Sequence, residues 1–327
     1  MHLKAGLLIL PLILSTVHLR ADDGAASIPA GGVVVMKREA RITMAKEVLQ
    51  ISASKVNVDY DFRNDSNEEV TTEVAFPIPT YRLAVGELIP SQQGFDDFRL
   101  WIDGKRASYV TEARAFCKGR EYTELLTSLH VDVASFGHVD TNNESPDIKR
   151  LTTGQRSQLL QLGLIDSEDD NAMWTVEKKY YWRQKFPAHA VVHIRHEYTP
   201  ALGSLNSITY GMGPDPDASS AKELSSFCID GRLHTVLQQI ANSTDKDAYY
   251  FYVDFILTTA NTWKTPIEDF SLIVERPHER EPAANYVSFC WDGPVIKTDA
   301  DHFSVHSINF VPKKELRIGY FVERKRS

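Results

Sequence analysis

Two similar hexapeptides hold two of the three cysteines in the chain. They read SFCIDG at 226–231 and SFCWDG at 288–293, and the third cysteine, Cys117, stands apart from both. Three interpretations fit the pair: a duplicated module, a metal site of thiolates and carboxylates, or a disulfide between Cys228 and Cys290. The residues that flank the two hexapeptides do not match, which argues against a duplication.

A metal site is the weaker alternative, because two soft and two hard ligands with no neighbouring histidine form a poor zinc shell. Alternation favours the disulfide. Val287, Phe289 and Trp291 share the core face of a strand, so Cys290 points to the other face. We therefore expect Cys228 and Cys290 to be bonded, holding the helix that follows Cys228 against the outer face of a sheet.

The histidines do not form a predicted catalytic or metal site. His193 and His196 face opposite sides of a strand, and His302 and His306 share a face but have Cα atoms roughly 13 Å apart. The sequence also lacks a Gly-x-Ser-x-Gly elbow, a His-Glu-x-x-His helix and a phosphate-binding glycine loop. We predict no catalytic residue, no metal ligand and no cofactor.

One connection between strands, 258–266, could bind a partner. Asn261 and Trp263 combine a hydrogen-bonding amide with a large aromatic surface, the residue types that dominate binding hot spots. The alternative is a tryptophan packed into its own protein. We retain Asn261 and Trp263 as the predicted interaction loop.

Alternating polar and apolar residues predict antiparallel strands through most of the chain. Val56, Val58, Tyr60 and Phe62 share one face of a half-buried strand, and Asp103-Gly104 supplies the residues of a tight hairpin turn. Residues 249–258 are apolar on both faces, which is typical of a central strand. The predicted fold is mainly β, with antiparallel β-sandwich regions.

Two segments break this pattern with helical periodicity. Within 113–172, leucines recur at helical spacing, Thr152 and Gln155 stand at the two positions of a capping box, and Gly163 follows as a C-terminal stop. A further helix is expected over 231–241. We predict a helical insertion at about 113–172 in an N-terminal β-sandwich region, 22–200, followed by a C-terminal β region, 201–327.

The N-terminal residues 1–21 have the form of a secretory signal peptide, with Lys4 before a short apolar run. No later stretch is long enough for a transmembrane segment. We expect a periplasmic or extracellular protein, a compartment that favours disulfides. The net charge of −8 provides no basic surface for nucleic acid.

Several stretches resemble the bacterial exported domain-of-unknown-function family numbered 4424. The stretches are VDYDFRNDSNEEVTTEVAFPIP (58–79), LTTGQRSQLLQLGLI (151–165), YYWRQKFPAHAVVHIRHEYTPALGS (180–204), the helix after Cys228, ILTTANTWKTPIEDFSLIVE (256–275) and VSFCWDG (287–293). The resemblance implies an exported β-rich fold with a recurring cysteine pair at Cys228 and Cys290. It implies no reaction or ligand, and Cys117 is not part of the family pattern.

From these observations we expect a non-catalytic binding or envelope-associated module whose partner is a protein or a cell-envelope ligand. A rigid bridged scaffold with long loops and no catalytic motif motivates this expectation. The alternative is an exported hydrolase whose polar residues converge only in the folded chain.

Overall fold

The computed structural model describes most of the chain between Asp23 and Arg326, and the predicted leader 1–21 lies outside the described residues. The described ranges are 23–27, 35–82, 88–89, 97–134, 150–167, 171–277 and 284–326. No helix within these ranges has the length and apolar character needed to cross a membrane.

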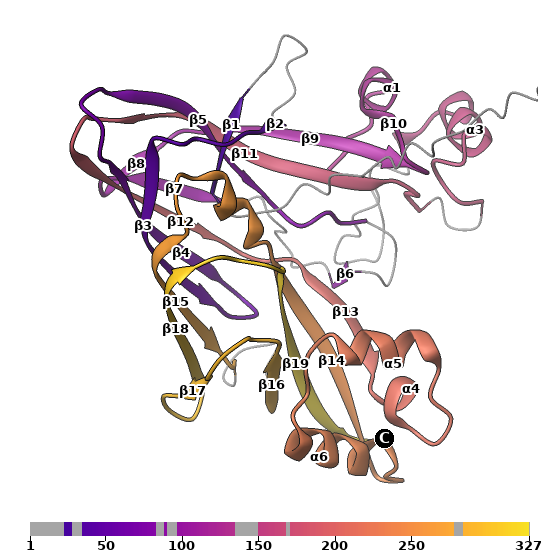
Figure 1. The fold of residues 1–327 in the computed structure, drawn as a ribbon. Helices are drawn as coiled ribbons and strands as arrows, with labels where there is room; N and C mark the ends of the chain where they lie inside the picture. Colours follow the sequence, from indigo (N-terminus) through magenta and orange to yellow (C-terminus); the bar gives the residue numbers. More distant parts are fainter. Residues whose placement is uncertain are drawn as a thin grey trace, which may run out of the picture.

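The described strands form three β-sheets, and their pairing is mostly antiparallel, as the alternation predicted (Figure 1). The six-stranded sheet runs β10 (Arg120–Glu121), β9 (Val110–Cys117), β11 (Thr175–Phe186), β5 (Val70–Pro77), β1 (Gly24–Ser27), β2 (Val35–Met36). The eight-stranded sheet runs β17 (Ile296–Lys297), β18 (His302–Phe310), β15 (Ile267–Glu275), β3 (Ile42–Ile51), β4 (Val56–Asn64), β12 (Ala190–Tyr198), β7 (Arg99–Ile102), β8 (Lys105–Ala107). The five-stranded sheet runs β16 (Tyr286–Phe289), β19 (Leu316–Lys325), β14 (Lys246–Phe255), β13 (Leu202–Ser207), β6 (Leu88–Ile89). Among the named strands, only β15 and β3 pair in parallel.

The six-stranded and eight-stranded sheets pack face to face around an aromatic core. Strand β4 alternates between buried and partly exposed residues along its whole length, which confirms the predicted half-buried strand. Phe62 of β4 packs edge-on against Phe186 of β11, and Phe98 stacks on Tyr180 at 4.1 Å between ring centroids. The paired inner faces therefore make a β-sandwich.

Strand β1 is held in the six-stranded sheet by residues from distant parts of the chain. The Asp23 carboxylate accepts a hydrogen bond from His196 Nε2 at 2.8 Å, and the Asp23 carbonyl accepts one from Trp263 Nε1 at 2.5 Å. The Ala25 N–H donates to Thr262 Oγ1 at 3.0 Å. These contacts fix the start of the described chain inside the sandwich.

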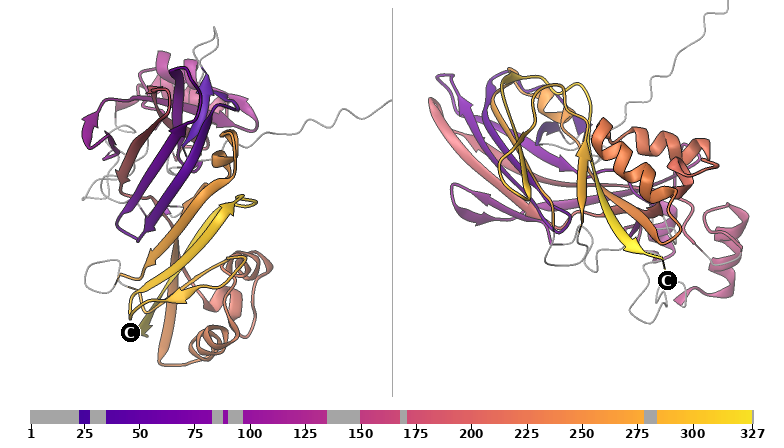
Figure 2. Two further views of the ribbon diagram at one scale, coloured as in Figure 1. Left: turned by 60° about the vertical axis from the view of Figure 1, so that its left-hand side comes forward. Right: turned by 90° about the horizontal axis from the view of Figure 1, so that it is seen from below.

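The five-stranded sheet carries three helices on its outer face, α4 (Thr209–Met212), α5 (Ala218–Ser225) and α6 (Gly231–Ala241) (Figure 2). Strand β14 pairs on both sides, with β13 and β19, which confirms the predicted central strand. Phe227 lies directly on β19, where a side chain at Gly319 would come within 2.7 Å of its ring. Glycine at 319 therefore lets the helical layer approach the sheet.

The other helices lie within the segment 113–172. Helix α1 (Thr123–Ser128) and helix α3 (Thr153–Gln161) are short, and β9 and β10 occupy the beginning of the segment. The predicted capping box forms between Thr152 and Gln155, and Gly163 has φ +66, as its C-terminal position requires. The predicted helix at 231–241 is α6, which confirms that prediction.

Strands from both sides of residue 200 share the eight-stranded sheet. Strand β15 pairs with β3 through six residue pairs, from Asp269 with Lys46 to Val274 with Ile51. Strands β18 and β17 then extend the sheet beyond β15. The predicted division into 22–200 and 201–327 stays a prediction, and any such regions are joined by this sheet.

Candidate functional site

Cys228 and Cys290 form a disulfide in the structure, with Cα atoms 4.9 Å apart. Cys228 directly follows Phe227 in the sequence. The Ser288 Oγ donates a hydrogen bond to the Phe227 carbonyl oxygen at 2.9 Å. Because Ser288 and Cys290 are two residues apart in an extended segment, both reach the outer face, as the alternation predicted. The bond ties the segment before α6 to the segment that leaves β16.

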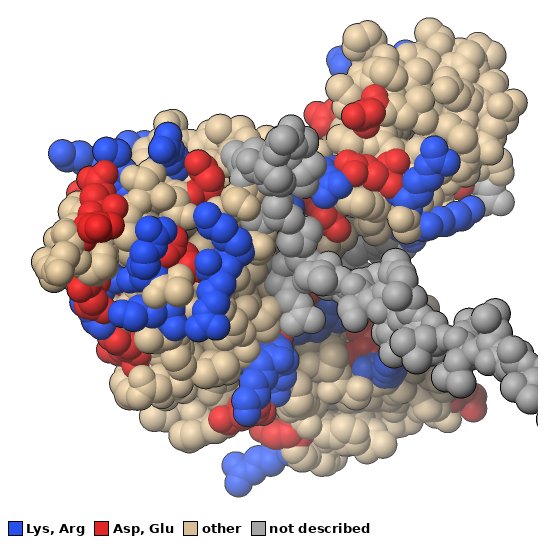
Figure 3. All heavy atoms as spheres, turned by 45° about the horizontal axis from the view of Figure 1, so that its top comes forward, with Lys and Arg blue, Asp and Glu red and all other residues tan. Residues whose placement is uncertain are grey.

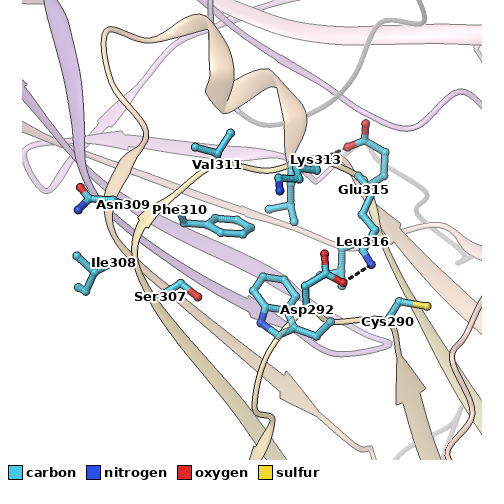
Figure 4. A pocket seen from close by; sticks show the side chains of 13 residues that line it. Cys290, Asp292, Ser307, Ile308, Asn309, Phe310, Val311, Lys313, Glu315 and Leu316 are labelled. Carbon is cyan, nitrogen blue, oxygen red and sulfur yellow. Dashed lines mark hydrogen bonds and ion pairs between the residues drawn. The ribbon is translucent and has the colours of Figure 1, made fainter.

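A cavity of about 410 Å³ lies beside this disulfide, and Cys290 is part of its lining. Its walls come from the end of β18, the connection 311–315, and the segment 290–292 that follows β16. Figure 4 shows Phe310 and Lys313 between the strand that carries Ser307 and the segment that carries Asp292. The cavity therefore lies where the eight-stranded and five-stranded sheets meet.

Two aromatic rings, those of Phe310 and Trp291, form the apolar floor of the cavity, and both pack on the buried ring of Phe270. Phe310 stacks on Phe270 at 4.5 Å between centroids and lies 5.3 Å from Trp291, which stacks on Phe270 at 5.7 Å. Simple alternation would place Phe310 on the outer face with Ile308. Asn309 has φ +52 and interrupts that alternation, a conformation that asparagine tolerates better than most residues. The strand end is thus turned so that Phe310 meets the core.

One carboxylate at the cavity has a structural role. Glu315 accepts the N–H groups of Leu257 and Thr258 at 2.9 and 3.2 Å and the Thr258 hydroxyl at 2.9 Å. These residues begin the short 3₁₀ helix η1 (Thr258–Thr262). Glu315 therefore caps η1 and fixes the connection 311–315 against it.

Other polar groups around the cavity are available to a ligand. Lys314 and Asp292 form an ion pair of 2.9 Å at the surface, which contributes little stability when both groups are solvated. In the described part of the chain, neither the Lys313 ammonium nor the Trp291 N–H has a protein acceptor. The cavity thus combines an aromatic floor with unused hydrogen-bond donors.

The predicted interaction loop lies next to this cavity, but its two residues have different environments. Asn261 is exposed and its Nδ2 donates to the Pro312 carbonyl oxygen at 2.9 Å, so it supports the connection 311–315. Trp263 is only 1% exposed, and its ring packs against Phe62 and Phe186. Trp263 is thus a tryptophan packed into its own protein, which was the alternative to a binding role. A binding role for the loop stays a prediction, and it rests on Asn261.

The histidines lie outside the residues that line this cavity. His193 is exposed and contacts Asp61 at 2.9 Å, whereas His196 is fully buried with Asp23, so the two face opposite sides of β12 as predicted. Burial raises the pKa of the Asp23 carboxyl, and the nearby His196 opposes that shift. Within the described ranges, no three His, Cys, Asp or Glu side chains lie close enough to hold a metal ion.

At the turn before β18, Asp299 accepts hydrogen bonds from the backbone N–H groups of Asp301 and His302 and from the His302 ring. The backbone donor from Asp301 is the largest cause that lowers the pKa of Asp299 to about 2. Asp299 is therefore ionised at neutral pH and closes the turn between β17 and β18.

A second, smaller cavity of about 150 Å³ lies near the start of β13. Arg317 donates two 2.7 Å hydrogen bonds to Asp254, and its guanidinium lies 4.2 Å from the centroid of the Tyr252 ring. Tyr252 in turn covers Gly203, where an added Cβ would fall 2.1 Å from the ring. These groups are all engaged with one another, so this cavity offers less to a ligand.

The charged surface shown in Figure 3 mixes both signs, with Lys and Arg lying among Asp and Glu. Elsewhere in the described chain, charged groups also pair, as Arg63 does with Glu268 at 2.8 Å.

Two solved structures illustrate what the chain is similar to. One, from Legionella pneumophila, is described as a candidate nutrient-binding protein; it has 14% identity and a TM-score of 0.40, over 87% of this chain and 68% of its own. The other is an M1 zinc metallopeptidase from Deinococcus radiodurans, with 8% identity and a TM-score of 0.28, over 87% of this chain and 43% of its own.

The present chain thus spans less than half of the metallopeptidase. No curated protein matches the chain significantly. A family profile, in contrast, matches residues 21–318, which is most of the sequence and includes both cysteines of the disulfide. The chain therefore belongs to the DUF4424 family, a domain of unknown function.

Proposed function

We propose that this protein is a non-catalytic binding module of the cell envelope and that it holds its ligand in the cavity beside the disulfide. The observation that carries the proposal is the combination of aromatic rings and unused hydrogen-bond donors at this cavity. An aromatic floor of Phe310 and Trp291, backed by the buried Phe270, lies beside the Lys313 ammonium and the Trp291 N–H, which have no acceptor among the described residues. Ligand sites generally pair apolar walls with a few such polar groups.

The way the cavity is held supports a binding role. The wall formed by 290–292 is tied to the helical layer by the disulfide. The wall formed by the connection 311–315 is tied to η1 by Glu315 and Asn261. Walls that are already fixed lose little entropy when a ligand is bound. The cavity is therefore preorganised for binding.

An exported location is part of this proposal. The signal-peptide pattern over 1–21 and the disulfide between Cys228 and Cys290 support it, because disulfides persist in oxidising compartments. Mass spectrometry of the protein isolated from periplasm or medium would locate the processed N-terminus, which we expect near Asp22. Recovery of the reduced, unprocessed chain from the cytosol would contradict the location.

Filling the cavity should abolish ligand retention. Ser307 lines the cavity, so Ser307→Trp would place an indole where the ligand is expected. The matched control is Val191→Trp, which adds the same group at an exposed position of β12 outside the lining residues. Immobilised wild type, Ser307→Trp and Val191→Trp are incubated with envelope extract, and bound material is identified by mass spectrometry.

We expect wild type and Val191→Trp to retain the same component and Ser307→Trp to lose at least most of it. Circular dichroism of each variant checks that the fold is preserved. Equal retention by all three proteins, or no enriched component on wild type, would contradict the proposed site.

A further inference from the structure

The outer edge of β18 is open along most of its length. Strand β17 pairs only with Ser304 and Phe303. In the part of the chain that the structure describes, no strand pairs with this edge from Val305 onward. The open stretch coincides with the cavity, whose lining includes the consecutive residues 307–311.

The hydrogen-bond alternation identifies which backbone groups face the open edge. The Arg276 N–H donates to the Asp301 carbonyl, so the odd-numbered residues of β18 bond to β15. The Thr298 N–H donates to the His302 carbonyl, so the even-numbered residues face β17. Continuing this alternation, His306 and Ile308 present their N–H and C=O groups to the open edge.

Pro294 explains why β17 does not cover this edge. With Ile296 opposite Ser304, continued pairing would place Pro294 opposite His306. Proline has no N–H to donate to a ladder, so pairing ends there. The preceding residues Trp291 and Asp292 instead form the far wall of the cavity. A slot therefore lies between the open edge and that wall.

Apolar side chains are exposed along the same edge. Ile308 is 61% exposed and Val311 is 45% exposed. Sheet edges are usually protected by pairing, by charge or by a bulge, because an open apolar edge recruits another strand. Here residues 307–311 on the β18 side of the slot carry no charged side chain, and within the described chain no strand pairs with their outer edge.

We propose that an extended peptide segment of a partner protein binds in this slot as an added strand of the eight-stranded sheet. This inference rests on the proposed function, since it names the partner of the same cavity. Backbone groups of His306 and Ile308 would bond to the segment, as in other cases of strand addition. The segment residue opposite Ser307 shares its inner face and enters the aromatic floor, so it is apolar, and a carboxylate on the segment pairs with Lys313.

The inference is tested with displayed heptapeptides that alternate Thr with Val, Ile, Leu or Phe and end in Glu. Enriched peptides are synthesised with a fluorophore, and their affinity for the intact protein is measured by anisotropy. Ile308→Pro removes one outward N–H that the ladder to β15 does not use, so the fold is retained. Ile308→Thr keeps that N–H and is the matched control.

We expect Ile308→Pro to weaken peptide binding about tenfold, the equivalent of one lost hydrogen bond, and Ile308→Thr to change it much less. Ser307→Trp should abolish binding. N-methylation of alternate peptide amides should weaken binding in one register and leave the other unaffected, because only every second amide faces β18.

Four results would overturn the inference. Envelope material retained by the cavity without any enriched peptide would leave the proposed function standing and exclude this partner class. Peptide binding that survives Ser307→Trp would place the peptide elsewhere. A dimer in sedimentation that Ile308→Pro dissociates would identify a second copy of the chain as the occupant. Absence of both envelope retention and peptide binding in the wild-type protein would remove the proposed function as well.

Discussion

Asp23 is a carboxylate enclosed by protein, and its surroundings explain much about how the first strand is held. Its side chain meets His196, itself fully buried among Tyr60, Phe76 and Phe98. Alternation along β12 predicted that His193 and His196 face opposite sides of the strand, but not that a carboxylate 173 residues away would meet His196. Such a contact depends on how distant strands pack, which local sequence does not specify.

The stability of the protein should depend on pH through Asp23. Burial raises the pKa of its carboxyl above the ordinary value of 3.8, so the folded state binds this proton more tightly than the unfolded state. Its contribution to the free energy of unfolding is therefore fully present below pH 3.8 and is lost as the pH rises through the folded pKa. Asp23→Asn keeps an acceptor for His196 but does not titrate.

Urea unfolding of wild type and Asp23→Asn between pH 3 and pH 7 measures this effect. We expect the free energy of unfolding of wild type to fall relative to Asp23→Asn as the pH rises. A constant difference, or one that increasingly favours wild type, would show that burial does not govern this carboxyl.

At the scale of elements, local patterns predicted strands and helices well and their pairing poorly. The buried face of β4, the hairpin at Asp103, the Thr152 capping box and α6 all follow from short-range rules. The cavity beside the disulfide does not follow from such short-range rules. Its floor depends on the positive φ of Asn309 at a strand end, and its opening depends on where Pro294 falls in the register between β17 and β18 and on how the segment 290–292 packs.

The disulfide is the clearest element-scale contribution to stability. It closes a loop with a sequence separation of 62 residues. On the chain-entropy account, a loop of this size corresponds to about 4 kcal/mol of destabilisation of the unfolded state. The double substitution Cys228→Ala with Cys290→Ala should therefore lower the free energy of unfolding by about that amount, as measured by urea denaturation.

Reductant provides the control for this prediction. It should destabilise wild type and Cys117→Ala, and should leave the double variant unchanged, because Cys117 takes no part in the bond. Reductant sensitivity that persists in the double variant, or a loss of less than about 1 kcal/mol, would contradict the assignment.

At the scale of the whole molecule, the eight-stranded sheet unites residues from both halves of the chain. Strand β15 lies between β3 and β18, so a fragment that ends at residue 200 would leave β3 with an open edge. The same fragment would lack Thr262 and Trp263, which hold β1. The family resemblance predicted a β-rich exported fold, but the parallel pairing of β3 with β15 brings together residues more than 200 positions apart and leaves no local signal.

We expect the full chain to unfold in one cooperative transition that is the same by far-ultraviolet circular dichroism and by tryptophan fluorescence. The fragment 23–200 should show no cooperative transition. A fragment that unfolds cooperatively at the midpoint of the full chain would establish an independent N-terminal domain.

The anchoring of β1 also has a consequence for biogenesis. Its partners Thr262 and Trp263 are synthesised some 240 residues after Asp23. In a nascent chain β1 can pair with β2 and β5 early, but its contacts with Thr262 and Trp263 cannot form until those residues have emerged. If the chain is exported as proposed, this late completion of the sandwich would help to keep it competent for translocation.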